Sequence, residues 1–208
     1  TLSYFMYQNP RRAKKLFHDI IPKSSDEFLG HLNKFNTQSN QEQIENPVWH
    51  IMNGENSIGN VNVTYNLILN LVAASGKNDP AIILDFVKKY DENINSSNKQ
   101  FINDLIKGAI NFERDITSEK INYKTPSSEE RKIFEDLINR LRSQAESADA
   151  ETIQTEIYQI GKDHNFENLR DWFKLIYQVL FGKEDGPRFG TFIAIYGIKQ
   201  TIKLIEEK

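Results

Sequence analysis

The chain of 208 residues contains no cysteine, carries a formal net charge of −3, and is 38% hydrophobic and 26% charged. The lack of cysteine excludes disulfides, thiol catalysis and cysteine-ligated metal sites. No run approaches the roughly 18 apolar residues of a membrane helix, and residues 1–6 lack the charged and apolar regions of a signal peptide. We therefore expect a soluble, cytoplasmic protein without a membrane partner.

Helix signals begin near the N-terminus. Asn9 and Pro10 provide a cap and a first-turn proline for a helix that we expect to end at Pro22. The run Ser-Ser-Asp-Glu at residues 24–27 predicts a capping box for the following helix. Residues 36–46 are polar and have no apolar periodicity, so we expect a loop there.

Apolar residues recur with helical spacing through the rest of the chain, and strand signals are weak. The predicted helices cover residues 63–74, 80–90, 98–112, 126–141, 153–160 and 169–181, and a final apolar helical segment covers residues 189–205, interrupted by Gly190 and Gly197. Gly161 and Gly182 follow two of these apolar stripes, and we expect each to end its helix. The pattern predicts an all-α fold of two helical subdomains joined near residues 115–126.

Charge is distributed unevenly along the chain. Residues 1–23 contain five basic side chains and one acidic one, and residues 170–203 contain six basic and three acidic ones. Residues 113–156, in contrast, contain seven basic and eleven acidic side chains. A surface that binds phosphates is therefore expected near the two ends.

Catalytic and metal-binding motifs are not found in the sequence. The four histidines are too far apart for a metal-binding pair on one helix, and neither a phosphate-binding G-x-x-x-x-G-K-[ST] loop nor a G-x-S-x-G elbow occurs. Neighbouring carboxylates such as Glu129 and Glu130 are interpreted as solvated helix faces. We predict no catalytic residue and no metal ligand.

One cluster, around residues 177–192, combines residue types that could bind a planar, polar ligand. A helix is expected to end at Gly182 and a tight turn to form at Gly186 and Pro187. Arg188 then offers a fork of donors beside an aromatic residue, a combination that holds unpaired nucleic-acid bases. An equally weighted alternative pairs Arg188 with a nearby acidic residue of the loop, Glu184 or Asp185, and places Phe189 in the core.

The run GKEDGPRFGTFIAIYG at residues 182–197 resembles the C-terminal signature of class I lysyl-tRNA synthetases. Three other stretches resemble the family in the same order: YQNPRRAKKL at residues 7–16, IIPK at residues 20–23, and NPVWHI at residues 46–51 followed by LNL at residues 69–71. The family's catalytic HIGH and KMSKS motifs do not occur in this sequence. The resemblance implies the part that follows the catalytic domain, and hence recognition of lysine tRNA.

The resemblance also implies an organisation. Residues 1–45 would be a stem-contact region and linker, residues 46–120 a first helical subdomain, and residues 121–208 an anticodon-binding subdomain. The helices would form a cage related to that of glutamyl-tRNA synthetases. Attachment of lysine, with ATP and magnesium, would occur in a catalytic domain outside this chain, which would be inactive alone and hold no cofactor.

The resemblance implies two sets of binding residues. Those for the anticodon are Tyr177, Gly186, Pro187, Arg188 and Phe189, and those for the tRNA backbone are Arg11, Arg12, Lys14 and Lys15. We expect a monomer that binds lysine tRNA and no DNA. The rival hypothesis is a non-catalytic helical protein-interaction module, which the negative net charge mildly favours.

Overall fold

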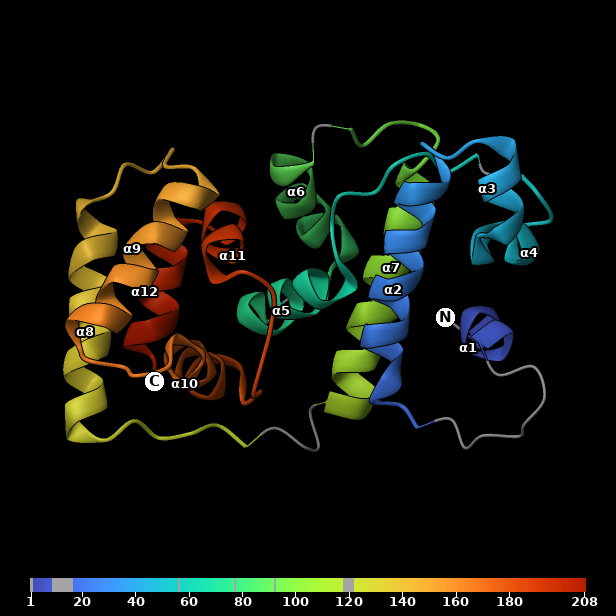
Figure 1. Cartoon of the computed structure of the whole chain (residues 1–208). Coiled ribbons are helices and arrows are strands. Elements are labelled where there is room, and N and C mark those ends of the chain that lie inside the picture. The colour runs from blue at the N-terminus through green and yellow to red at the C-terminus, as the bar shows by residue number, and fades with distance from the viewer. Residues whose placement is uncertain (1, 9–16, 56, 77, 92, 118–121) are drawn as a thin grey trace. The chain divides into compact units, whose positions relative to one another are not determined.

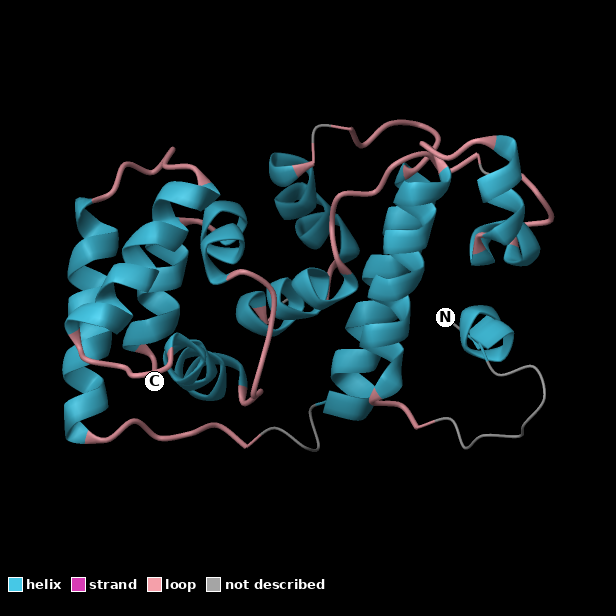
Figure 2. Cartoon of the chain, viewed as in Figure 1, coloured by secondary structure: helices cyan, strands magenta, loops and turns pink. Residues whose placement is uncertain are grey.

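The computed structural model describes residues 2–8, 17–55, 57–76, 78–91, 93–117 and 122–208 (Figure 1). Within these residues the regular secondary structure is helical and no strand is present, which confirms the prediction of an all-α fold (Figure 2). None of the helices in the described ranges combines the length and the apolar character needed to cross a membrane.

The chain forms two compact units. The first comprises Thr1–Leu69 with Asp79–Asn111, and the second comprises Asn70–Asn78 with Phe112–Lys208. Helix α5 (Tyr65–Ser75) contributes residues to both units. The assignment of residues 1–45, 46–120 and 121–208 to three functional regions stays a prediction.

The first unit contains the N-terminal helices. Helix α1 packs on α2 and α4, and α4 also contacts α2 and α3. The helices are α1 (Leu2–Gln8), α2 (Ile20–Phe35), α3 (Asn40–Glu45), α4 (Pro47–Ile51), α6 (Pro80–Tyr90) and α7 (Lys99–Phe112), of which α7 ends in the second unit.

Helix α2 differs from its prediction. Pro22 does not end a helix but lies in the first turn of α2, where a proline is tolerated because its missing N–H would have no helical partner. Residues 24–27 lie inside α2 and do not cap it. Instead the Asp26 carboxylate accepts hydrogen bonds from the Tyr65 backbone N–H and, at 2.6 Å, from Asn66 Nδ2, and so caps α5.

The loop prediction for residues 36–46 is wrong in part, because α3 forms there. The Glu42 carboxylate accepts the Ser39 backbone N–H at 2.8 Å, which is half of a capping box. A helix of six residues begun by a polar cap has too few apolar positions to produce a periodic pattern. Its local cap and its contacts with α4 hold it instead.

The second unit is built on helices that follow the π-helical turn Glu113–Thr117. Helix α9 packs against α8, α10 and α11, and α12 packs against α8 and α11 (Figure 1). Their bounds are α8 (Ser128–Ser143), α9 (Ala150–Asp163), α10 (Leu169–Phe181), α11 (Phe189–Tyr196) and α12 (Ile198–Glu206).

Two glycines predicted to end helices have different roles. Gly182 ends α10 in the left-handed conformation, with φ of 64°, as predicted. Gly161, in contrast, lies inside α9, which continues to Asp163. A Cβ at Gly161 would come within 2.7 Å of Leu169 and 2.8 Å of Trp172, so the glycine permits the close approach of α10. Trp172 is fully buried there and donates its indole N–H to the Ile157 carbonyl at 3.0 Å.

Candidate nucleic-acid interface

The structure brings together the five residues predicted to bind an anticodon, in the loop of residues 182–188 and at its two ends. The Tyr177 hydroxyl, in the last turns of α10, donates a hydrogen bond to the Pro187 carbonyl. Gly186 lies against the face of the Tyr177 ring so closely that an added Cβ would overlap the ring. Phe189, the first residue of α11, packs edge-on against Tyr177 with 6.0 Å between ring centroids.

The two aromatic rings of this cluster are buried. Tyr177 is 2% exposed and Phe189 is 0% exposed, and both pack within a set of rings that includes Phe181 and Phe192. Burial, followed by the nearby Asp185 carboxylate, raises the pKa of Tyr177, so its hydroxyl stays a neutral donor. Direct stacking of either ring on a base would require it to leave this packing. Phe189 thus has the core position that the alternative interpretation gave it.

Arg188 is the side chain of the cluster that reaches solvent. It is 55% exposed, and its Nη2 atom lies 2.8 Å from Glu151 Oε2 in the first turn of α9. The sequence suggested an acidic partner from the loop, but Glu184 pairs with Lys174 at 2.9 Å. Because a guanidinium has five N–H donors, this contact to Glu151 leaves others able to bind a ligand.

The position of Arg188 follows from the packing of α11 on α9. The Gly190 backbone N–H donates to Gln154 Oε1 at 2.7 Å, and both residues are buried. A Cβ at Gly190 would come within 2.5 Å of the Ala150 carbonyl and 2.7 Å of Gln154. Glycine therefore lets the start of α11 lie on the start of α9, which places Arg188 beside Glu151.

A lysine anchors the other end of the loop. Lys183 Nζ lies 3.5 Å from Asn70 Oδ1 and 4.0 Å from Glu113 Oε2. Burial lowers the pKa of Lys183, while the carboxylates of Glu113 and Asp185 act in the opposite direction. Sequence reasoning did not identify Lys183, Gln154 or Glu151, because each meets its partner across at least 36 residues of chain.

The second predicted set, Arg11, Arg12, Lys14 and Lys15, lies outside the described residues. Its role in binding the tRNA backbone stays a prediction, as does the anticodon role of the loop residues.

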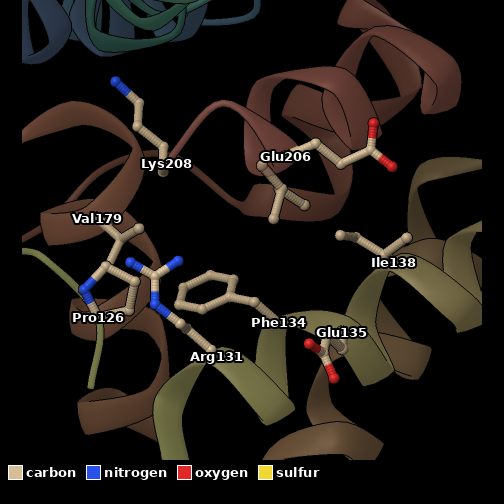
Figure 3. A pocket seen from close by; sticks show the side chains of 9 residues that line it. Pro126, Arg131, Phe134, Glu135, Ile138, Val179, Glu206 and Lys208 are labelled. Carbon is tan, nitrogen blue, oxygen red and sulfur yellow. The ribbon is translucent and has the colours of Figure 1, made fainter. Parts of the chain in front are cut away.

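The described residues of the second unit also line cavities elsewhere, and the two considered next contain no predicted site residue. One, of about 150 Å³, is lined by side chains of α8, α10 and the C-terminal residues (Figure 3). Its floor includes the core residues Phe134 and Val179, and its rim includes Arg131. The other, of about 260 Å³, lies beside Tyr196, whose hydroxyl donates to the Ala74 carbonyl at 2.9 Å.

Across the described ranges, no group of three His, Asp or Glu side chains could hold a metal ion.

Comparison with known proteins finds relatives along the whole chain, although no protein-family model matches it. Proteins named lysine–tRNA ligase from Rickettsia bellii, Rickettsia felis and Rickettsia conorii are 40%, 39% and 38% identical to it. The matches cover 99% to 100% of this chain. The chain spans only 40% of the length of each relative.

Proposed function

We propose that this chain, which is homologous over its whole length to part of the lysine–tRNA ligases, is the part that recognises lysine tRNA. The observation that carries the proposal is the 40% identity across all of its residues to proteins with that name. Lysine attachment, with ATP and magnesium, would take place in another part of a longer, cytoplasmic class I enzyme. The chain itself would act as a monomer that holds no cofactor and binds no DNA.

The loop of residues 182–188 supports anticodon binding. Single-stranded bases are commonly bound through hydrogen bonds to their edges and through stacking on arginine planes. The Arg188 side chain is half-exposed, and the packing of α11 on α9 sets the position of its backbone. In this proposal Tyr177 and Phe189 fix the shape of the loop, and Gly186 and Pro187 bring backbone groups near the base. The cage of helices would be related to that of glutamyl-tRNA synthetases.

The basic segment of residues 11–15 would supply a second contact. Its four basic side chains would bind phosphates of the tRNA stem, a contact that raises affinity without reading sequence. The anticodon loop would then supply the discrimination among tRNAs.

The test measures binding of the chain to a lysine tRNA transcript by fluorescence anisotropy, against the same transcript with a substituted central anticodon base. Substitution is expected to weaken binding, and so is Arg188→Ala, by about 1–3 kcal/mol. Arg170→Ala is the matched control, because Arg170 is also exposed and lies in the first turn of α10. That variant should retain wild-type discrimination.

Several outcomes would contradict the proposal. Equal affinity for both transcripts would show that the chain does not recognise the anticodon and that only the stem contact contributes to binding. Binding of a protein but of no RNA, with affinity indifferent to salt between about 50 and 200 mM, would favour the protein-interaction module. Lysine-dependent exchange of pyrophosphate into ATP by the chain alone would show that activation does not occur elsewhere.

A further inference from the structure

We propose that Glu151 is a specificity-determining residue, which makes the Arg188 site select a base edge and reject a phosphate. This inference rests on the proposed function, because it concerns how the same loop distinguishes parts of an RNA. No sequence motif pointed to Glu151, which lies 37 residues before Arg188 in the chain.

The contact between the two side chains has the geometry of a charge-assisted hydrogen bond, with 2.8 Å between Arg188 Nη2 and Glu151 Oε2. Both side chains are well exposed, at 55% for Arg188 and 73% for Glu151. An ion pair in that environment contributes little to folding stability, because water screens the attraction and two long side chains lose freedom. Stability alone therefore does not account for the pair.

The pair presents a donor next to an acceptor. A guanidinium only donates hydrogen bonds and a carboxylate only accepts them. The Watson–Crick edge of uracil, which a lysine anticodon contains, has a carbonyl oxygen beside a ring N–H. Arg188 can donate to that carbonyl while Glu151 accepts the N–H, so a base edge satisfies both side chains.

A phosphate does not satisfy both, because it has only acceptor oxygens and carries a negative charge. An exposed arginine without an acidic neighbour binds phosphate readily through its planar fork of donors. A phosphate placed on Arg188 would lie beside the negative Glu151 carboxylate and be repelled by it. Glu151 thus removes the sequence-independent contact that Arg188 alone would make.

Other groups near the pair are consistent with a site that is not a phosphate cradle. Asp149, which caps α9, accepts the backbone N–H groups of Glu151 and Thr152, each at 2.9 Å. Asp185 lies three residues before Arg188 in the same loop. These carboxylates lower the positive potential around Arg188, which disfavours phosphate and leaves recognition to hydrogen bonds with a base.

The experiment uses an anticodon stem–loop of lysine tRNA and a second stem–loop that is abasic at the central anticodon position. The abasic probe keeps every phosphate and lacks only the base. Affinities of the wild-type chain, Glu151→Gln and the control Glu184→Gln are measured by anisotropy. Glu184 is a fair control because it is an exposed carboxylate of the same loop, 75% exposed, and pairs with Lys174 rather than Arg188.

The wild-type chain is expected to prefer the complete stem–loop over the abasic one. In Glu151→Gln the abasic probe should bind more tightly, and the preference should fall by about fivefold or more. For that variant, the slope of log affinity against log salt concentration should become steeper by about 1, because one more phosphate would be neutralised. Glu184→Gln should change the preference by less than about twofold, because the base-reading pair stays intact.

Three results would count against the inference in different ways. An unchanged preference in Glu151→Gln overturns the role of Glu151 and leaves anticodon recognition intact. An equal fall in both variants overturns it as well, because the effect is then one of net charge only. A wild-type chain that binds both probes equally contradicts the proposed function itself.

Discussion

At the scale of single residues, the shape of the candidate site depends on how closely a glycine approaches a ring. Gly186 rests on the face of Tyr177, and the Tyr177 hydroxyl holds the carbonyl of the next residue, Pro187. The sequence predicted a turn at these positions and an aromatic ring near it. It did not indicate that the ring is buried beneath the turn, so that Tyr177 supports the loop from inside.

Gly186→Ala is expected to destabilise the chain and to weaken tRNA binding together. The new methyl group would overlap the Tyr177 ring, and overpacking of this kind costs about 1–3 kcal/mol. Urea unfolding measures the free energy of unfolding, and anisotropy measures the affinity for lysine tRNA.

Gly30→Ala is the matched control for that prediction. A Cβ at Gly30, in the interior of α2, would meet nothing within 4 Å. The substitution should therefore stabilise the chain by about 1 kcal/mol through helix propensity. A Gly186→Ala protein as stable as the wild type would show that the loop can move off the ring at no cost.

At the scale of elements, caps explain which helix ends could be predicted. Asp79 accepts the Ala81 N–H at 2.9 Å and caps α6, which begins at Pro80, where the sequence predicted a helix to begin. The left-handed Gly182 ends α10, also as predicted. Asp26 instead caps α5 across about 40 residues of chain. Local pattern therefore assigned Asp26 to the wrong helix.

Asp26 gives a pH dependence with a defined sign. Its burial raises the pKa of the carboxyl above its ordinary value, although hydrogen bonds from Asn66 and Tyr65 partly oppose this. The folded state therefore favours the protonated form. The stability that this preference contributes is fully present below the unfolded-state pKa of about 4 and is lost as pH rises through the raised folded-state pKa.

The matching variant is Asp26→Asn, which keeps an acceptor oxygen for the α5 cap and does not titrate. The free energy of unfolding of the wild type relative to this variant should decrease in urea titrations as pH rises above about 4, through the raised folded-state pKa of Asp26. Because the other titrating groups are the same in both proteins, the difference between their free energies of unfolding reports the titration of Asp26. A difference that is independent of pH would show that the pKa of Asp26 is the same in the folded and unfolded states.

At the scale of the whole molecule, the RNA binding that we propose for a chain with a net charge of −3 would depend on local charge. The five basic side chains of residues 1–23 and the half-exposed Arg188 are the candidates for this contact. The two would differ in kind, because a phosphate contact depends on salt and a base contact depends on sequence.

Replacing Arg11, Arg12, Lys14 and Lys15 by alanine together should weaken lysine tRNA binding equally for matched and substituted anticodons. The slope of log affinity against log salt should become shallower by about 0.9 for each phosphate that the segment no longer neutralises. Anisotropy between about 50 and 200 mM salt measures both quantities. An unchanged slope would show that this segment does not contact tRNA phosphates. A change in the ratio of affinities for matched and substituted anticodons would show that the segment contacts the anticodon region.

The sequence by itself determined the all-α class, most of the long helices and the resemblance to a tRNA ligase. These depend on apolar spacing, on caps next to their helices and on short motifs, all of which are local. Only the tertiary structure decided that Glu151 pairs with Arg188 and that Gly161 and Gly190 allow helices to approach closely. These features depend on which distant surfaces pack together, and a spacing pattern does not contain that information.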